Sequence, residues 1–80
     1  MIKVVITEKK GRRRVADLPL TLRFKHPNGY GQILRQTNKQ GEAYFDEVSE
    51  CKGEIFIQGR LQYSGDMQEN PTIIINLNNN

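Results

Sequence analysis

Hydrophobic and polar residues alternate along several short stretches of this chain, and each stretch predicts a β-strand with one apolar face. The most regular alternation runs from Leu18 to Lys25, where three leucines and a phenylalanine occupy every second position. The first residues, 2–7, and the last apolar segment, 72–77, alternate in the same way. Pro19 has no backbone N–H and is therefore expected at the start of its strand or on an edge of the sheet.

The segment from Gly31 to Val48 predicts a strand, a tight turn and a second strand. Asn38 and Gly41 suit the first and fourth positions of a type I turn with a left-handed glycine, a combination that closes three-residue hairpin loops. We therefore expect the two flanks to pair with each other as a hairpin, with Thr37 opposite Ala43. In this register the residues expected on the core face are Ile33, Arg35, Thr37, Ala43 and Phe45, and those expected on the outer face are Leu34, Gln36, Tyr44 and Asp46.

The second half of the chain contains further strand patterns and several turn signals. Four apolar residues keep one phase between residues 54 and 63, namely Ile55, Ile57, Leu61 and Tyr63. Gly59 lies among them and indicates either one bent strand or two short strands. Residues 26–29 and 49–53 predict turns, residues 64–71 a loop, and residues 78–80 a disordered tail.

Six or seven short strands separated by turn signals are typical of an all-β domain. We predict one small antiparallel β-sandwich, immunoglobulin-like or prealbumin-like, that spans residues 1–77. A small OB- or SH3-like barrel is the alternative. The residues predicted to form the core are Leu20, Leu22, Phe45, Ile55, Ile57, Ile73 and Ile75.

The composition bounds the size of that core. The chain has 80 residues, of which 36% are hydrophobic and 26% charged, so we expect a thin core between two facing β layers. No apolar run approaches the roughly 20 residues that span a membrane, and no signal-peptide pattern follows Met1. For a complete chain, these observations favour a cytoplasmic protein without membrane association.

Candidate catalytic chemistry is sparse in this sequence. Cys51 is the only cysteine and His26 the only histidine, and they are far apart in the chain. Nucleophilic catalysis needs a base beside the nucleophile, and neither paired carboxylates nor a metal-ligand spacing can be recognised. We therefore predict that the protein is not an enzyme and uses no cofactor or metal.

Charge is divided unevenly along the chain. Residues 1–40 contain ten Lys or Arg and two acidic residues, a net charge of +8, whereas residues 41–80 contain two Lys or Arg and seven acidic residues, a net charge of −5. Such asymmetry occurs in nucleic-acid-binding proteins, but in a sandwich the two halves interleave and opposite charges become neighbours. The loop cations either keep a sheet edge from pairing or bind phosphate. The candidate basic patch consists of Lys9, Lys10, Arg12, Arg13, Arg14, Arg23 and Lys25.

Several segments together resemble carboxypeptidase regulatory-like and Cna-B-type domains, which belong to the transthyretin-like (prealbumin-like) β-sandwiches. The similar segments are LPLTLRF at 18–24, ILRQTNKQGEAYFDEV at 33–48 and KGEIFIQG at 52–59. Thr37, Asn38 and Gly41 match the family's Thr-Asp-x-x-Gly pattern, although Asn38 replaces the usual aspartate. The resemblance implies a spacer, an adhesion module or an accessory domain. It also makes Lys3 and Asn76 candidates for the intramolecular isopeptide bond of some such domains.

Two functions are compatible with these features. The first is a non-catalytic module that acts through contacts with an unknown protein partner or through self-association. The second, as the alternative, is a nucleic-acid-binding domain that uses the basic loop at residues 9–14. For the first function we expect one exposed apolar cluster within a polar rim, as in protein-binding patches. Its expected members are Tyr30, Leu34, Tyr44, Phe56 and Ile74.

Overall fold

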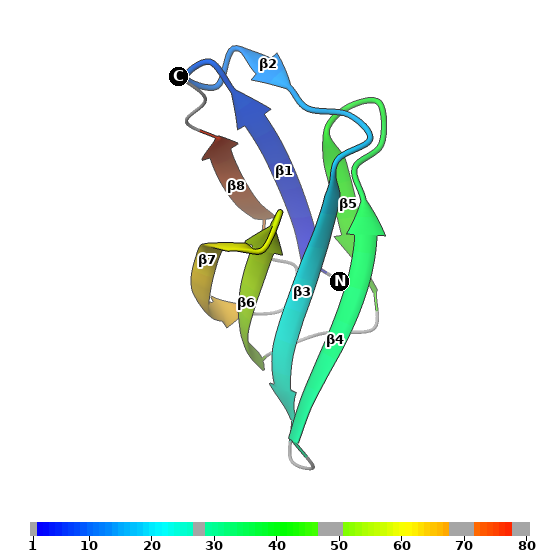
Figure 1. Cartoon of the computed structure of the whole chain (residues 1–80), viewed down its shortest axis with the longest axis vertical. Coiled ribbons are helices and arrows are strands. Elements are labelled where there is room, and N and C mark those ends of the chain that lie inside the picture. The colour runs from blue at the N-terminus through cyan, green and yellow to red at the C-terminus, as the bar shows by residue number, and fades with distance from the viewer. Residues whose placement is uncertain (1, 27–28, 47–50, 68–71, 78–80) are drawn as a thin grey trace.

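Two β-sheets packed face to face make up the computed structural model, which describes residues 2–26, 29–46, 51–67 and 72–77 (Figure 1). All regular secondary structure in these residues is β-strand, so the prediction of an all-β sandwich is confirmed. The predicted tail at 78–80 lies outside the described residues. The strands are β1 (Ile2–Glu8), β2 (Arg13–Arg14), β3 (Pro19–His26), β4 (Gly29–Gln36), β5 (Glu42–Phe45), β6 (Cys51–Ile57), β7 (Arg60–Met67) and β8 (Thr72–Leu77).

The sheet nearer the viewer in Figure 1, the front sheet, has the order β4-β3-β6-β7, and all of its neighbours are antiparallel. In the back sheet, β1 is central, with β5 and β2 along one side and β8 along the other. Strand β8 pairs with β1 in parallel, from Lys3 opposite Thr72 to Glu8 opposite Leu77. The back sheet is therefore mixed, which corrects the expectation of a purely antiparallel sandwich.

Residues at every second position of the strands meet between the two sheets. All seven residues predicted for the core are buried, with at most 6% of their surface exposed. They are the inward-facing set of β3, β5, β6 and β8, as the period of two requires. Ile2, Val4 and Ile6 of β1 add a fully buried row to this core.

The central segment does not form the expected hairpin. Strand β4 pairs with β3 in the front sheet, whereas β5 pairs with β1 in the back sheet. The expected pairing of Thr37 with Ala43 is therefore wrong, and residues 37–41 carry the chain from one sheet to the other. The expected facing is right, since Phe45 is buried and Leu34 is exposed. Alternation fixes the face of a residue, whereas its partner strand depends on the whole fold.

The crossing between the sheets is made by the predicted turn. The Gly41 N–H donates to the Asn38 carbonyl at 3.0 Å, and Gly41 has a φ of 75°, so the left-handed glycine is present. The Asn38 Oδ1 atom accepts the N–H groups of Gln40 at 2.9 Å and Glu42 at 3.0 Å. The Ile6 N–H donates to the Gly41 carbonyl at 2.8 Å, which ties the turn to β1.

Several predicted turn and loop boundaries shift. Strand β6 begins at Cys51, inside the turn expected at 49–53, and β7 continues to Met67, inside the loop expected at 64–71. Gly59 lies in the two-residue turn between β6 and β7, where its φ is 76°, so this segment forms two strands rather than one bent strand. The turn expected at 26–29 connects β3 to β4, and its residues 27–28 lie outside the described residues.

Candidate protein-contact face

The outer face of the front sheet carries a row of largely apolar side chains that crosses all four strands. Leu34 of β4 lies opposite Thr21 of β3, Thr21 lies opposite Phe56 of β6, and Phe56 lies opposite Leu61 of β7. Adjacent strands are about 4.8 Å apart, so the row is about 14 Å long. Leu34 and Leu61 expose 65% and 52% of their surface, while Thr21 and Phe56 are half-buried between them. We call Leu34, Thr21, Phe56 and Leu61 the apolar row.

Charged and aromatic residues occupy the outward positions beside the apolar row. Arg23 lies opposite Glu54, and Lys25 lies opposite Tyr30. The Arg23 guanidinium is stacked on the Tyr30 ring, with Cζ 4.4 Å from the ring centroid, which is a cation–π contact. These four residues and Lys52 are among those that line a depression of ≈ 290 Å³. The face therefore combines an apolar strip with a predominantly basic hollow.

Leu61 keeps the phase of the core residues Ile55 and Ile57 in the sequence, yet it faces outward in the structure. Ile55 pairs with Tyr63 while Phe56 pairs with Leu61, so Gln62 is the extra residue of a β-bulge. An extra residue places the two residues that flank it on opposite faces. Tyr63 consequently packs against the core, and Leu61 faces solvent. Gly59 lies in the turn between β6 and β7, so it does not mark the position of this bulge in the sequence.

The five residues expected to form one apolar cluster lie on two different faces. Tyr30, Leu34 and Phe56 belong to the front sheet, whereas Tyr44 of β5 and Ile74 of β8 belong to the back sheet. A single cluster would require β5 and β8 to share a sheet with β4. The crossing at residues 37–41 instead takes β5 to the back sheet, and β8 pairs there with β1. Four of the five side chains are exposed as expected, and Phe56 is half-buried.

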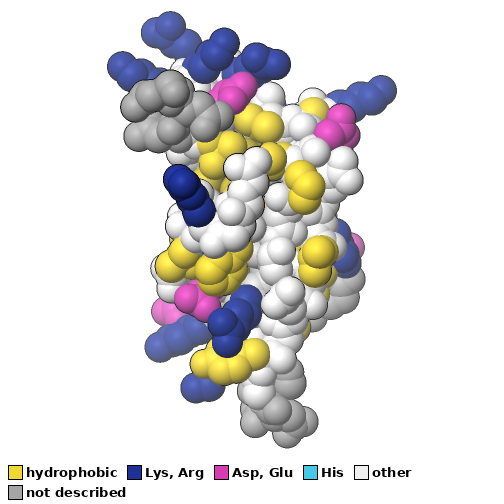
Figure 2. All heavy atoms as spheres, viewed as in Figure 1, with side chains coloured by type: hydrophobic (Ala, Val, Ile, Leu, Met, Phe, Trp, Pro, Cys, Tyr) yellow, Lys and Arg dark blue, Asp and Glu magenta, His cyan; other side chains and the backbone are white. Residues whose placement is uncertain are grey.

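The candidate basic residues also separate into two groups. Residues 9–14 form the tip and second strand of the β1–β2 hairpin at the upper end of the molecule. Arg23 and Lys25 lie toward the lower end of β3, beside Tyr30. Figure 2 shows Lys and Arg side chains gathered near both ends of this face, with hydrophobic side chains between them. The residues of the candidate basic patch therefore lie in two separate places on the domain.

The basic hairpin has an unusual backbone. Lys9 and Lys10 have φ values of 52° and 59°, in the left-handed region that residues other than glycine rarely occupy. The Arg13 Nε atom lies 3.3 Å from the Glu8 Oε1 atom, and Arg14 Nη1 donates to the carbonyl of Gln40 at 3.0 Å. Two of the basic side chains are thus engaged within the domain, whereas the two lysines at the tip are exposed.

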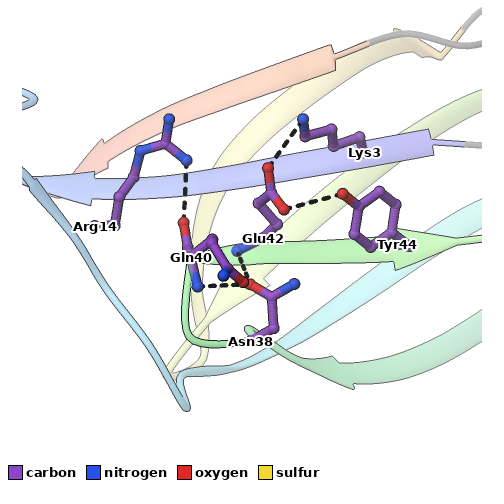
Figure 3. A network of polar contacts seen from close by, with 6 residues as sticks. All are labelled: Lys3, Arg14, Asn38, Gln40, Glu42 and Tyr44. Carbon is purple, nitrogen blue, oxygen red and sulfur yellow. Dashed lines mark hydrogen bonds and ion pairs between the residues drawn. The ribbon is translucent and has the colours of Figure 1, made fainter.

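The outer face of the back sheet holds a polar network (Figure 3). The Lys3 Nζ atom lies 2.9 Å from Glu42 Oε2, and the Tyr44 hydroxyl donates to Glu42 Oε1 at 3.0 Å. The hydrogen bond from Lys3 lowers the pKa of the Glu42 carboxyl and raises the pKa of Lys3 itself. The hydrogen bond to Glu42 raises the pKa of Tyr44. This contact between the two halves of the sequence agrees with the expected interleaving of their charges.

The candidate isopeptide pair is not brought together. Lys3 lies opposite Thr72, whereas Asn76 lies opposite Thr7. Four residues along a strand correspond to about 13 Å, which separates the Lys3 and Asn76 backbones. Among the described residues, no three His, Cys, Asp or Glu side chains lie close enough to hold a metal ion.

A second hollow, of ≈ 530 Å³, opens between the end of β8 and the turn that joins β6 to β7. Its lining includes apolar side chains from Val15, Leu18 and Ile57, together with the charged residues Glu8 and Arg60.

The part of the chain that the structure describes contains no helix that could cross a membrane. Neither a protein-family model nor a curated protein matches the sequence at a significant level.

Proposed function

We propose that this domain is a non-catalytic module that binds another protein through the outer face of the front sheet. The observation that carries the proposal is the apolar row, in which Leu34 and Leu61 are exposed at the two ends and Phe56 lies between them. A partner laid across the sheet would bury one continuous apolar strip. The fully buried centres of protein contacts are more apolar than their rims, and aromatic residues are enriched there.

The rim of the face indicates the chemistry of the partner. Arg23, Lys25 and Lys52 surround the hollow beside the apolar row, with Glu54 as the acidic residue among them. A partner with acidic side chains next to an apolar strip would complement both parts of the face. Such charge complementarity acts mainly on specificity and on the association rate.

The proposal includes a family relationship. We propose that the domain is related to the carboxypeptidase regulatory-like and Cna-B-type members of the transthyretin-like sandwiches, as an accessory or adhesion-like module. Asn38 and Gly41, which carry the resemblance, form the turn between the sheets. Thr37, the third matching residue, is buried at the same crossing. These defined structural roles support a shared fold signature.

Comparative capture tests the contact face. The immobilised domain and a Leu34→Lys/Leu61→Lys double variant are exposed to extract of the source cells, and the bound proteins are quantified by mass spectrometry. Both leucines are exposed, so the variant should keep its circular dichroism spectrum. Ile74→Lys, an exposed position on the back sheet, is the matched control.

The expected result is a protein that the wild type and Ile74→Lys retain equally and that the double variant retains at least about tenfold less, because each lysine would bury an unpaired charge in the contact. Equal retention by all three would contradict the proposal.

One observation favours nucleic-acid binding as a second candidate function. Tyr30 is 62% exposed and lies beside Arg23, Lys25 and Lys52 on an open sheet face. An exposed ring among cations can stack a base while the cations contact phosphates. If this site binds single-stranded nucleic acid, Tyr30→Ala should weaken binding, and affinity should fall steeply with salt. The absence of binding at about 50 mM salt would remove this candidate.

A further inference from the structure

The free edge of β4 in the front sheet is protected against pairing with other chains. Arg35 of β4 points inward at this edge, and its guanidinium carbon lies 6.0 Å from the centroid of the Phe45 ring. Its Nη1 atom also donates to the carbonyl of Leu34 at 2.9 Å. An inward-pointing charge is one of the devices by which proteins prevent edge-to-edge association.

The edges at β7, β5 and β2 have protection of other kinds. Strand β7 carries Arg60 and Asp66 and contains the bulge at Gln62, and both charges and bulges disfavour further pairing. The edge of the back sheet opposite β8 is formed by β5, which has four residues, and β2, which has two. Such short strands offer few backbone groups to an incoming chain.

Strand β8, on the other side of the back sheet, has none of these features. Its six residues, Thr72–Leu77, include no charge, no proline and no glycine. Within the described residues, β8 pairs with β1 alone, so every second residue directs its N–H and C=O groups toward the free edge. Ile74, in the middle of the strand, is 68% exposed on the outer face.

We propose that β8 pairs antiparallel with β8 of a second copy of this chain, so that the two back sheets join across a twofold axis. The segment Thr72-Ile73-Ile74-Ile75-Asn76 reads polar, apolar, apolar, apolar, polar in both directions. This symmetry suits an isologous contact, because residue i of one copy faces residue j of the other and j faces i, so the facing residues are alike in polarity.

The symmetry fixes the register of the contact. When Ile74 faces Ile74 of the partner subunit, Thr72 faces the partner's Asn76, and Ile73 faces the partner's Ile75. Apolar side chains then meet apolar ones and polar side chains meet polar ones, with no charge at the axis. The exposed Ile74 becomes covered by its symmetry mate, and the outer face of the front sheet stays free in both copies.

Sedimentation equilibrium over a concentration series tests the dimer. The wild type should convert reversibly from the mass of one chain to that of two as its concentration rises to about 1 mM, the weak range expected of a small interface. Ile74→Lys places two like charges at the axis and should raise the dissociation constant at least about tenfold. Leu34→Lys, an equally exposed position on the front sheet, should leave it unchanged.

Disulfide trapping tests the register. In a Cys51→Ser background, Ile74→Cys should yield a covalent dimer, because directly opposed residues lie within disulfide range. Thr72→Cys should not, since its symmetry mate lies about 14 Å away along the strands. A wild type that stays monomeric, association that continues beyond two chains, or equal trapping at both positions would overturn the proposal. These outcomes are independent of the capture experiment, which uses the front sheet.

Discussion

The hydroxyl of Thr37 donates a hydrogen bond of 2.7 Å to the carbonyl of Val15, 22 residues earlier in the chain. The same oxygen accepts the N–H of Leu18 at 2.9 Å, and Thr37 is buried. The backbone N–H of Thr37 also donates to the Leu18 carbonyl at 3.0 Å. One side chain thus ties the segment that leads into β3 to the point where the chain leaves the front sheet.

Replacing Thr37 by valine should lower the free energy of unfolding by about 1–3 kcal/mol. The shape of the side chain is kept, but the Val15 carbonyl and the Leu18 N–H lose their shared partner in a buried site. Urea denaturation measures the change, and Thr37→Ser, which keeps the hydroxyl, should lose less stability. A valine variant as stable as the wild type would show that the two hydrogen bonds are dispensable.

Gly41→Ala should destabilise the domain more than Gly59→Ala. Both glycines have left-handed φ values, of 75° and 76°, so alanine costs about 1–2 kcal/mol at either position. At Gly41 a Cβ atom would also lie 3.0 Å from the Ile6 carbonyl oxygen and 2.9 Å from the Arg14 Cβ, whereas at Gly59 no atom lies within 4 Å. Thermal unfolding of the two variants measures the additional loss of stability that this crowding causes at Gly41. Equal losses of stability in the two variants would contradict the prediction.

Replacing Lys9 and Lys10 by Asn and Gly should raise the free energy of unfolding by about 1 kcal/mol. The two lysines hold the left-handed geometry of a type I′ turn, for which Asn-Gly is strongly preferred. A Lys9→Gln/Lys10→Gln variant removes the same charges but keeps unsuitable residues, and it serves as the control in denaturant titrations. If both variants gain the same stability, charge repulsion rather than backbone geometry explains the effect.

The Lys3–Glu42 pair should make stability dependent on pH at the acidic side. The pKa of Glu42 is lowered in the folded state. Its contribution to the free energy of unfolding is therefore present near neutral pH and is lost as the pH falls through that lowered pKa. Glu42→Gln should therefore be less stable than the wild type near neutrality, with a difference that shrinks in acid. Both side chains still reach solvent, with 35% and 18% of their surface exposed for Lys3 and Glu42, so the difference should be small. A difference that does not change with pH would contradict the assignment.

The facing of residues could be predicted from the sequence wherever the alternation of a strand is unbroken, because it then follows from the local backbone. Phe45 and Leu34 have the predicted faces although their predicted partner strand is wrong. The same turn residues, Asn38 and Gly41, can close a hairpin or carry a chain between sheets. Whether they form a hairpin or a crossing depends on contacts with strands distant in the sequence. One such contact is the hydrogen bond between the Ile6 N–H and the Gly41 carbonyl.

The candidate contact face could be predicted only in part for the same reason. Tyr30, Leu34 and Phe56 were identifiable as outward-facing from their phase. Leu61 was not, because the bulge at Gln62 reverses its face and leaves no distinctive residue in the sequence. Tyr44 lies on the other sheet because of the crossing, and there it donates a hydrogen bond to Glu42.

The central claim is that the outer face of the front sheet is where this domain meets its partner. Backbone amide NMR spectra of the isotope-labelled domain, recorded alone and with the captured protein, test it most directly. We predict the largest shifts and intensity losses at the apolar row and at Arg23. Changes confined to β8 or to the tip of the β1–β2 hairpin would contradict the claim.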